Sequence, residues 1–577
     1  MEEKTINKPS MHRNFLYVTL TMNLVSIVFG IFYYIFRFYD YISNVFGFVL
    51  FITYIMNFIL TLTYDRIQTI PKKSRGALRV LSVIYLAYSI LSVLMMLGGN
   101  ILVQITYGPT FRDNLAGLLL NMAGFFGALI LGSIFSGISA TRINEVSRDV
   151  TDNLTVRSKG QKIGAIIGQS ISFLLLSLGV LTSITVLTGK IPEFLSFLYI
   201  LVYFIPECAL YFGILFLTAT ILALRLIPKK KKVYFYTVMA IGLSISAIHV
   251  IPSAMTSVEV VIANNRYTAA FGSSWQSIPA VDEKYMTRSP YSFARYMLGM
   301  HPNDYTVQRD VLYYDGYADP KDENISLYFD VYEPSGNRSI LPGKNSTIIR
   351  FHGGGLQWYD KGLSNMQKMN YYFASQGYVV FDIQYGMYGD PADGNFLTPG
   401  HVLGNFTIDD IMRHVGIFVQ YLVNNSAIYG ANINSVFLSG GSAGGLLTTT
   451  TALTLANGSY GYLYGGVPTP IDVKGIIPFY PWINVSGEGN IKGSPEMLRP
   501  YNLVDTNAPP CLIFQGNMDS TVDPAVTQLL QDAYENADRP CATLPFFFAE
   551  HVSDMFFEGY FNQVFLYYME RFMYQYR

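Results

Sequence analysis

The most informative segment of the C-terminal half of this chain is Leu438-Ser439-Gly440-Gly441-Ser442-Ala443-Gly444-Gly445. Residues 434–438 before it are typical of a short buried strand, and residues 446–456 after it are typical of a helix. A Gly-x-Ser-x-Gly pattern between a strand and a helix is that of a nucleophile elbow. A side chain at either outer glycine would collide with the neighbouring strand and helix. Ser442 is therefore predicted on a strained turn, with helix N–H groups ready to receive developing negative charge.

The elbow lies within alternating strands and helices. The predicted strands are residues 307–314, 325–332, 347–351, 378–383, 435–438, 475–479, 511–514 and 542–548. The predicted helices are residues 361–375, 408–423, 446–456, 524–535 and 553–574. The first two strands alternate apolar and polar residues like an antiparallel pair, whereas the later ones are short apolar runs typical of a buried parallel sheet. The pattern predicts an α/β fold with a mostly parallel eight-stranded sheet and helices on both faces.

Two residues complete a catalytic triad with the elbow serine. Asp519 follows the seventh predicted strand, and His551, the only histidine after Ser442, follows the last. A serine hydroxyl is a weak nucleophile until an imidazole takes its proton and a carboxylate orients that imidazole. The order Ser, Asp, His is the one expected for a nucleophile elbow in such a sheet. Asp523 competes as the acid, but it precedes a proline and is interpreted as a helix cap.

The run His352-Gly353-Gly354-Gly355 closes the third predicted strand. Glycines at a strand end let backbone N–H groups approach a substrate carbonyl oxygen, and each such donor is worth roughly 3 to 4 kcal/mol in the transition state. We assign the N–H groups of Gly353 and Gly354 to an oxyanion hole, together with that of Ala443. His352 and Gly355 are interpreted as support for the loop.

These motifs together resemble the α/β-hydrolase superfamily, and within it the hormone-sensitive-lipase-like carboxylesterases and their feruloyl-esterase-like relatives. The resemblance covers roughly residues 305–575. It implies hydrolysis of carboxylic esters through an acyl-enzyme without metal or cofactor. The expected substrate is a small-molecule or lipid ester, and the lipid alternative rests on the predicted membrane location alone. The chain departs from the family pattern at Gly441, at residues 382–386 and at Glu550. Two inserts, residues 387–405 and 483–504, are expected to shape specificity.

The N-terminal half has a different composition. The chain of 577 residues has 14% charged residues and 51% apolar ones, and its mean hydropathy is positive. Seven runs are long enough to cross a hydrocarbon core of about 30 Å: residues 15–36, 41–62, 80–97, 115–138, 163–188, 194–226 and 233–262. The sixth contains Pro206 and is long enough to be kinked, tilted or partly re-entrant.

Basic residues alternate between the loops. They gather after the second, fourth and sixth spans, at Arg66, Lys72, Lys73, Arg75, Arg79, Arg142, Arg148, Arg157, Lys159, Lys162 and residues 229–232. The positive-inside rule then predicts a cytoplasmic N-terminus, retained because no cleavage pattern follows it, and an extracytoplasmic C-terminal half. Seven Asn-x-Ser/Thr sites in the C-terminal half support this weakly: Asn324, Asn337, Asn345, Asn405, Asn424, Asn457 and Asn484. The predicted domains are a membrane domain at 1–262, a junction at 263–304 and a catalytic domain at 305–577.

Glu207 and His249 interrupt the sixth and seventh spans. Counted from the turn between these helices, they lie roughly 28 and 24 Å along their axes and are expected to meet near the outer leaflet. An ionisable residue inside a membrane is a functional-site hypothesis by default. A neutral hydrogen-bonded pair that fixes two helices explains them equally well, and the sequence leaves both interpretations open.

The sequence thus predicts a multi-pass membrane serine carboxylesterase or lipase-like hydrolase, with an ester substrate and the bilayer as partners. A net charge of −1 gives no sign of a nucleic-acid partner. Cys208, Cys511 and Cys541 form no metal-ligand spacing. Cys511 and Cys541 fall in predicted neighbouring strands, where a disulfide is the alternative, but buried free thiols are the expectation. An acyl transferase or serine peptidase on the same fold is the alternative within the enzymes. A receptor or transporter with a ligand-binding hydrolase-like domain is the alternative outside them.

Overall fold

The computed structural model describes residues 8–36, 40–63, 72–106, 108, 111–142, 159–227, 231–302, 304–467, 470–485 and 491–577. The chain divides into two compact units. The first unit comprises residues 1–103, 114–254 and 291–300, and the second comprises residues 104–113, 255–290 and 301–577. Some of the basic residues predicted to be cytoplasmic lie outside the described residues: Arg66, Arg148, Arg157, Lys229 and Lys230.

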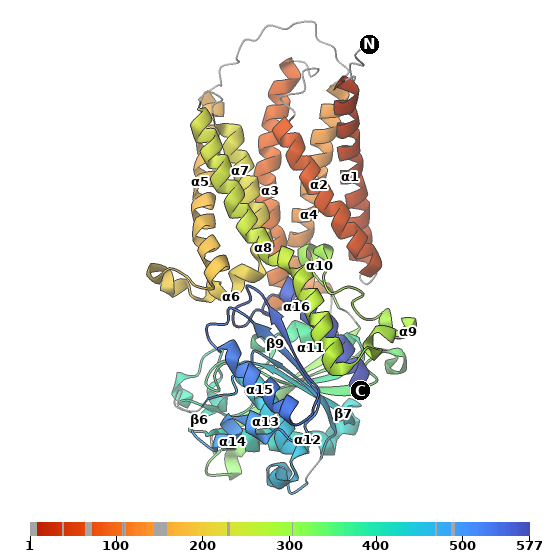
Figure 1. Ribbon diagram of the computed structural model, residues 1–577, viewed down its shortest axis with the longest axis vertical. Coiled ribbons are helices and arrows are strands. Elements are labelled where there is room, and N and C mark those ends of the chain that lie inside the picture. The colour runs from red at the N-terminus through yellow and green to blue at the C-terminus, as the bar shows by residue number, and fades with distance from the viewer. Residues whose placement is uncertain are drawn as a thin grey trace. The chain divides into compact units, whose positions relative to one another are not determined.

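Long helices make up the first unit (Figure 1). They are α1 (Lys8–Phe36), α2 (Asp40–Thr63), α3 (Lys72–Thr106), α4 (Phe111–Arg142), α5 (Lys159–Thr188), α6 (Ile200–Glu207), α7 (Ala209–Leu226) and α8 (Lys232–Phe271), with the short α10 (Phe293–Leu298). Residues 104–106 of α3, 111–113 of α4 and 255–271 of α8 belong to the second unit. Within the described residues, seven helices are long and apolar enough to cross a membrane, in agreement with the seven predicted spans. Buried amides join them: Asn23 and Asn57 exchange hydrogen bonds of 3.0 and 2.8 Å between α1 and α2.

The sixth predicted span is interrupted, as its proline suggests. A 3₁₀ segment, Glu193–Leu198, precedes α6, and α6 ends at Glu207 just after Pro206. Proline removes a helical N–H and crowds the preceding turn. The chain leaves helical geometry at Cys208, with φ −95° and ψ 7°, before α7 begins.

His249 does not take Glu207 as the partner of its ring nitrogens. Its Nδ1 lies 2.8 Å from the carbonyl oxygen of Ile245, and its Nε2 lies 2.9 Å from the hydroxyl of Thr182 on α5. The carbonyl oxygen only accepts, so Nδ1 donates to it, and in the neutral imidazole Nε2 then accepts from Thr182. His249 therefore joins two helices by hydrogen bonds, as one of the two interpretations expects. The helix that it joins to α8 is α5, which carries Thr182, and not α6, which carries Glu207.

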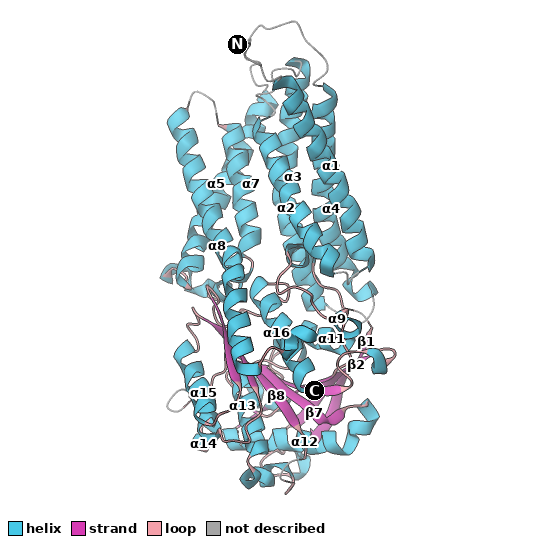
Figure 2. Ribbon diagram, turned by 45° about the vertical axis from the view of Figure 1, so that its right-hand side comes forward, coloured by secondary structure: helices cyan, strands magenta, loops and turns pink. Residues whose placement is uncertain are grey.

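An eight-stranded sheet forms the centre of the second unit (Figure 2). Its strands are β1 (Tyr305–Asp315), β2 (Ser326–Pro334), β3 (Ser346–Phe351), β4 (Val379–Ile383), β7 (Asn432–Gly441), β8 (Val473–Phe479), β9 (Cys511–Gly516) and β10 (Cys541–Phe546). The spatial order is β1-β2-β4-β3-β7-β8-β9-β10. The pairs β1–β2 and β2–β4 are antiparallel and the remaining pairs are parallel. All eight predicted strands are present, and the α/β-hydrolase fold class is confirmed.

Helices cover both faces of this sheet. They are α11 (Gln367–Ser375), α12 (Ile408–Tyr429), α13 (Ala443–Ala456), α15 (Pro524–Asn536) and α16 (Tyr560–Tyr576). The second unit also contains the short helices α9 (Ala280–Glu283) and α14 (Pro495–Leu498). Successive residues of a strand face opposite sides. Ile513 of β9 lies in the core cluster that includes α12 and α13 residues, whereas Phe514 packs against Phe565 of α16.

Two helices begin later than predicted. The chain before α11 forms a 3₁₀ turn at Gly362–Asn365, and α16 begins at Tyr560 because residues 551–559 form turns. The first insert folds into a small pair of strands, β5 (Met387–Tyr388) and β6 (Leu403–Gly404). The three cysteines are free, as expected.

Candidate active site

Ser442 occupies the strained turn that the sequence predicts. β7 ends at Gly441, α13 begins at Ala443, and Ser442 between them has φ 55° and ψ −119°. Such angles are costly for a residue with a side chain and persist only where the surroundings enforce them. The first N–H groups of a helix have no partner within that helix. The helix therefore leaves the N–H of Ala443, its first residue, available as a donor next to Ser442.

The glycines around Ser442 allow close backbone approach. A methyl carbon added at Gly440 would lie 2.5 Å from the carbonyl oxygen of Phe351 on β3, and one at Gly444 would collide with the same oxygen. Real side chains do not tolerate such separations. The steric reason for both glycines, inferred from the motif, is therefore present in the structure.

Asp519 and His551 lie together at the ends of β9 and β10. The Nδ1 of His551 donates to Oδ2 of Asp519 at 2.9 Å. The other carboxylate oxygen, Oδ1, accepts from the N–H groups of Thr521 and Val522 at 3.0 and 2.7 Å. Asp523 instead accepts from the N–H of Ala525 and caps α15, which confirms its interpretation as a helix cap.

Tyr480 connects the serine turn with His551 and is absent from the sequence prediction. The N–H of Ser442 donates to the carbonyl of Phe479 at 3.0 Å. Tyr480, the residue after Phe479, therefore lies next to the serine turn. Its ring lies 4.6 Å from the imidazole of His551, and its hydroxyl donates to Asp554 at 2.5 Å. Burial raises the pKa of Asp554. The available signal was the position of Tyr480 at the end of β8, where sites of this fold gather.

Glu550 bridges the two loops that carry Asp519 and His551. Its carboxylate accepts from the N–H and hydroxyl of Ser520 and from the N–H of His551. Burial raises the pKa of Glu550, although these hydrogen bonds oppose that effect. The sequence shows Glu550 only as a departure from the family pattern. Its bridging role depends on its contact with Ser520, which is thirty residues away along the chain.

The glycine loop lies against the serine turn. A methyl carbon added at Gly353 would lie 3.0 Å from the carbonyl oxygen of Gly441 and 3.5 Å from Cβ of Ser442. Gly354 and Gly355 have φ of 109° and 62°, which residues with side chains rarely adopt. The loop therefore brings its backbone close to the serine.

His352 supports this loop. Its Nδ1 donates to the carbonyl oxygen of Gly353 at 2.8 Å, and its ring stacks on that of Tyr385 at 4.4 Å and 11°. The hydroxyl of Tyr385 donates to the backbone carbonyl of His352 at 2.6 Å. Burial lowers the pKa of His352, so the ring is held in its neutral form.

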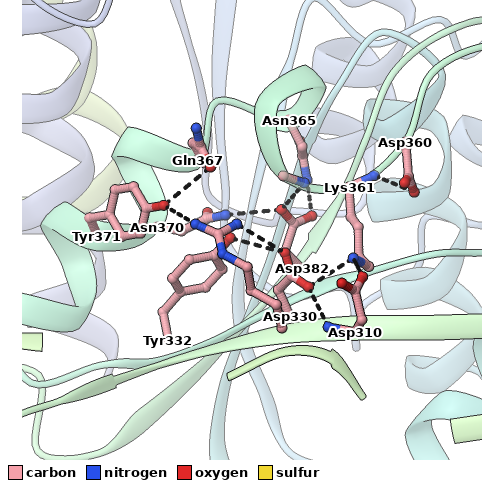
Figure 3. Close-up of polar contacts among 12 residues, drawn as sticks. Asp310, Asp330, Tyr332, Asp360, Lys361, Asn365, Gln367, Asn370, Tyr371 and Asp382 are labelled. Atoms are coloured by element: carbon pink, nitrogen blue, oxygen red, sulfur yellow. Dashed lines mark hydrogen bonds and ion pairs between the residues drawn. The ribbon is translucent and has the colours of Figure 1, made fainter. Parts of the chain in front are cut away.

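A charged network holds the far end of the loop (Figure 3). The ammonium group of Lys361 lies 2.6 Å from Asp310 and 2.8 Å from Asp330. Asp382 of β4 accepts from the N–H of Gly362 at 2.7 Å and from Asn365 at 2.6 Å. Burial, followed by the charge of Asp330, raises the pKa of Asp382 to about 7. Among the described residues no group of three His, Cys, Asp or Glu side chains has the arrangement of a metal site.

The strand order and the strained serine turn are those of the α/β-hydrolase fold. Residues 329–534 match the BD-FAE family model. The structure is also similar to esterase 2 of Thermogutta terrifontis. Its apo form is 22% identical, with 47% of this chain and 92% of that chain covered and a TM-score of 0.34. The form phosphonylated by cyclosarin is 24% identical, with 42% and 84% covered and a TM-score of 0.33. No curated protein gives a significant match.

Proposed function

We propose that this protein is a membrane-bound serine carboxylesterase whose catalytic domain lies outside the cytoplasm. The proposal is carried by the hydrogen bond of 2.9 Å between His551 and Asp519, together with the strained strand-to-helix turn that holds Ser442. The match of residues 329–534 to BD-FAE supports carboxylic esters as the substrate class. The seven apolar helices support attachment to a membrane.

The geometry supports an acyl-enzyme mechanism. The Oγ of Ser442 attacks the ester carbonyl carbon while Nε2 of His551 takes its proton, and Asp519 holds the imidazole and stabilises its charged form. The N–H groups of Gly353, Gly354 and Ala443 stabilise the negative oxygen. The bond to the alcohol then breaks and His551 protonates the leaving alcohol. Water attacks the acyl-serine in the same way and releases the acid.

The position of the site in a membrane protein favours lipid or lipid-like esters. A substrate that partitions into the bilayer is concentrated near any enzyme anchored there, because each buried methylene group contributes about 0.8 kcal/mol to partitioning. We therefore expect catalytic efficiency to rise with acyl-chain length across a series of p-nitrophenyl esters. The reverse order would favour small soluble esters.

Active-site labelling tests the reaction. A fluorophosphonate probe should label the detergent-solubilised full-length protein, and Ser442→Ala should abolish both labelling and p-nitrophenyl ester turnover. Ser459→Ala, an exposed serine on the same domain, is the control and should retain both. Full labelling and turnover in Ser442→Ala would overturn the proposal. Addition of a competing alcohol or amine, followed by product analysis, separates a hydrolase from an acyl transferase.

A further inference from the structure

His551 lies on the connection between β10 and α16, residues 547–559, which we call the histidine loop. Two non-glycine residues in this loop, Phe548 and Val552, have left-handed φ values of 62° and 59°. Such a backbone is uncommon for any side chain and especially so for a β-branched residue. It persists only where contacts from outside the loop enforce it. The histidine loop therefore needs external anchors on each side of His551.

The first anchor is Glu259 of α8. Its Oε1 accepts from the N–H of Phe547 at 2.7 Å, at the point where β10 ends and the loop begins. β10 is the last strand of the sheet, so its outer backbone groups have no neighbouring strand. Arg266, seven residues further along the same helix, donates to the carbonyl of Thr543 at 3.1 Å. The C-terminal part of α8 therefore covers this edge with two polar side chains.

The second anchor is Gln104 at the end of α3. Its amide group donates to the carbonyl of Met555 and accepts from the N–H of Phe557 at 3.1 Å. One side chain thereby satisfies two backbone groups of the loop after His551. The Nε2 of Gln367 on α11 lies 3.4 Å from the backbone carbonyl of Gln104. All these residues belong to the second unit, although Gln104 is separated from the loop by about 450 residues of sequence.

We infer that Gln104 and Glu259 are positioning residues for the proposed hydrolysis, on which this inference rests. They fix the two ends of the histidine loop, and through the loop they hold the imidazole of His551 against Asp519. The C-terminal parts of α3 and α8 thus contribute to the catalytic geometry, with Gln104 beyond the predicted span 80–97 and Glu259 near the end of the predicted span 233–262. Neither residue contacts the reacting atoms, so each acts through the position of His551.

Loss of either anchor should lower kcat with little change in KM. Gln104→Met keeps the side-chain length but removes both polar contacts, and a misplacement of about 1 Å at a catalytic group costs on the order of 100-fold in rate. We expect kcat to fall roughly 10- to 100-fold. Glu259→Leu should behave likewise, whereas Glu259→Gln retains the acceptor for Phe547 and should keep kcat within about twofold. Arg266→Met is the matched control, because Arg266 lies on the same helix as Glu259 and contacts β10 at Thr543, away from the histidine loop.

A double-mutant cycle separates positioning from a general loss of structure. If Gln104 acts through the His551–Asp519 pair, then Gln104→Met should cost much less in an Asp519→Asn background than in the wild type. Folding is checked by the thermal unfolding temperature and by gel filtration in detergent. Folded Gln104→Met and Glu259→Leu proteins with wild-type kcat, beside an inactive Ser442→Ala, would overturn this inference and leave the proposed function intact. Losses of kcat in Glu259→Gln and Arg266→Met as large as the loss in Glu259→Leu would also overturn this inference. Activity in Ser442→Ala would instead overturn the proposed function.

Discussion

Asp519 and Asp523 stand four residues apart on one loop, yet their carboxylates have different partners. Asp519 accepts from His551, and Asp523 accepts from the N–H of Ala525 at the start of α15. Asp519→Asn should reduce kcat by about 10⁴-fold, because an amide does not hold the imidazole in the productive tautomer. Asp523→Asn should leave kcat unchanged, because asparagine caps a helix as well as aspartate does. Turnover of p-nitrophenyl esters by the two variants checks both expectations, and equal losses would contradict them.

Gly444 tests the packing of the serine turn. An alanine there would collide with the carbonyl oxygen of Phe351 and approach that of His352 to 2.7 Å. Overpacking of this kind costs roughly 1 to 3 kcal/mol, so Gly444→Ala should lower the thermal unfolding temperature and the yield of folded protein. Gly458→Ala is the control, since an added carbon at Gly458 meets nothing within 4 Å. A Gly444→Ala protein as stable as that control would contradict the steric argument.

At the scale of elements, Asp382 joins β4 to the turn and helix that follow the glycine loop. It accepts from Gly362, Asn365 and Asn370, and burial raises its pKa from 3.8 to about 7. The folded state therefore binds a proton more tightly than the unfolded state does. The stability contributed by this group is complete below about pH 4 and declines as the pH rises towards 7.

The raised pKa of Asp382 makes the stability of the protein depend on pH in a measurable way. The difference in unfolding temperature between the wild type and Asp382→Asn should change in favour of the variant as the pH rises from 5 to 7. Above pH 7 the difference should stay constant, because Asp382 is then ionised in both states. Thermal unfolding in one detergent at pH 5, 6, 7 and 8 provides the measurement. A difference that is independent of pH would show that Asp382 is already ionised in the folded protein at pH 5.

At the scale of the whole molecule, the orientation of the chain remains a prediction from its basic residues. Phe396 is 92% exposed on the catalytic unit, so Phe396→Cys provides an accessible thiol. The three native cysteines are buried or half-buried. We expect a membrane-impermeant maleimide to label Phe396→Cys in intact cells. Ser147→Cys, in the basic stretch after the fourth predicted span, should react only after permeabilisation. The opposite pattern would reverse the predicted topology.

The local features of this protein could be predicted from its sequence. The serine turn requires particular residues within five positions, each strand has its own apolar pattern, and each membrane-length helix is a continuous apolar run. Turn chemistry and hydrophobic periodicity act over neighbouring residues, so they are legible without a fold. The order Ser, Asp, His was also legible, although the roles assigned to these residues and to the oxyanion glycines remain predictions.

Folding determines which distant groups meet. Only the folded chain shows that Glu550 bridges two loops, that the ring of Tyr480 meets that of His551 edge-on and that His249 bonds to Thr182. It also groups the ends of α3 and α8 with the catalytic unit, where Gln104 and Glu259 reach the histidine loop. Such contacts join residues tens to hundreds of positions apart, and no local pattern encodes them. They depend on the sheet order and helix packing, which bring remote side chains within hydrogen-bonding distance.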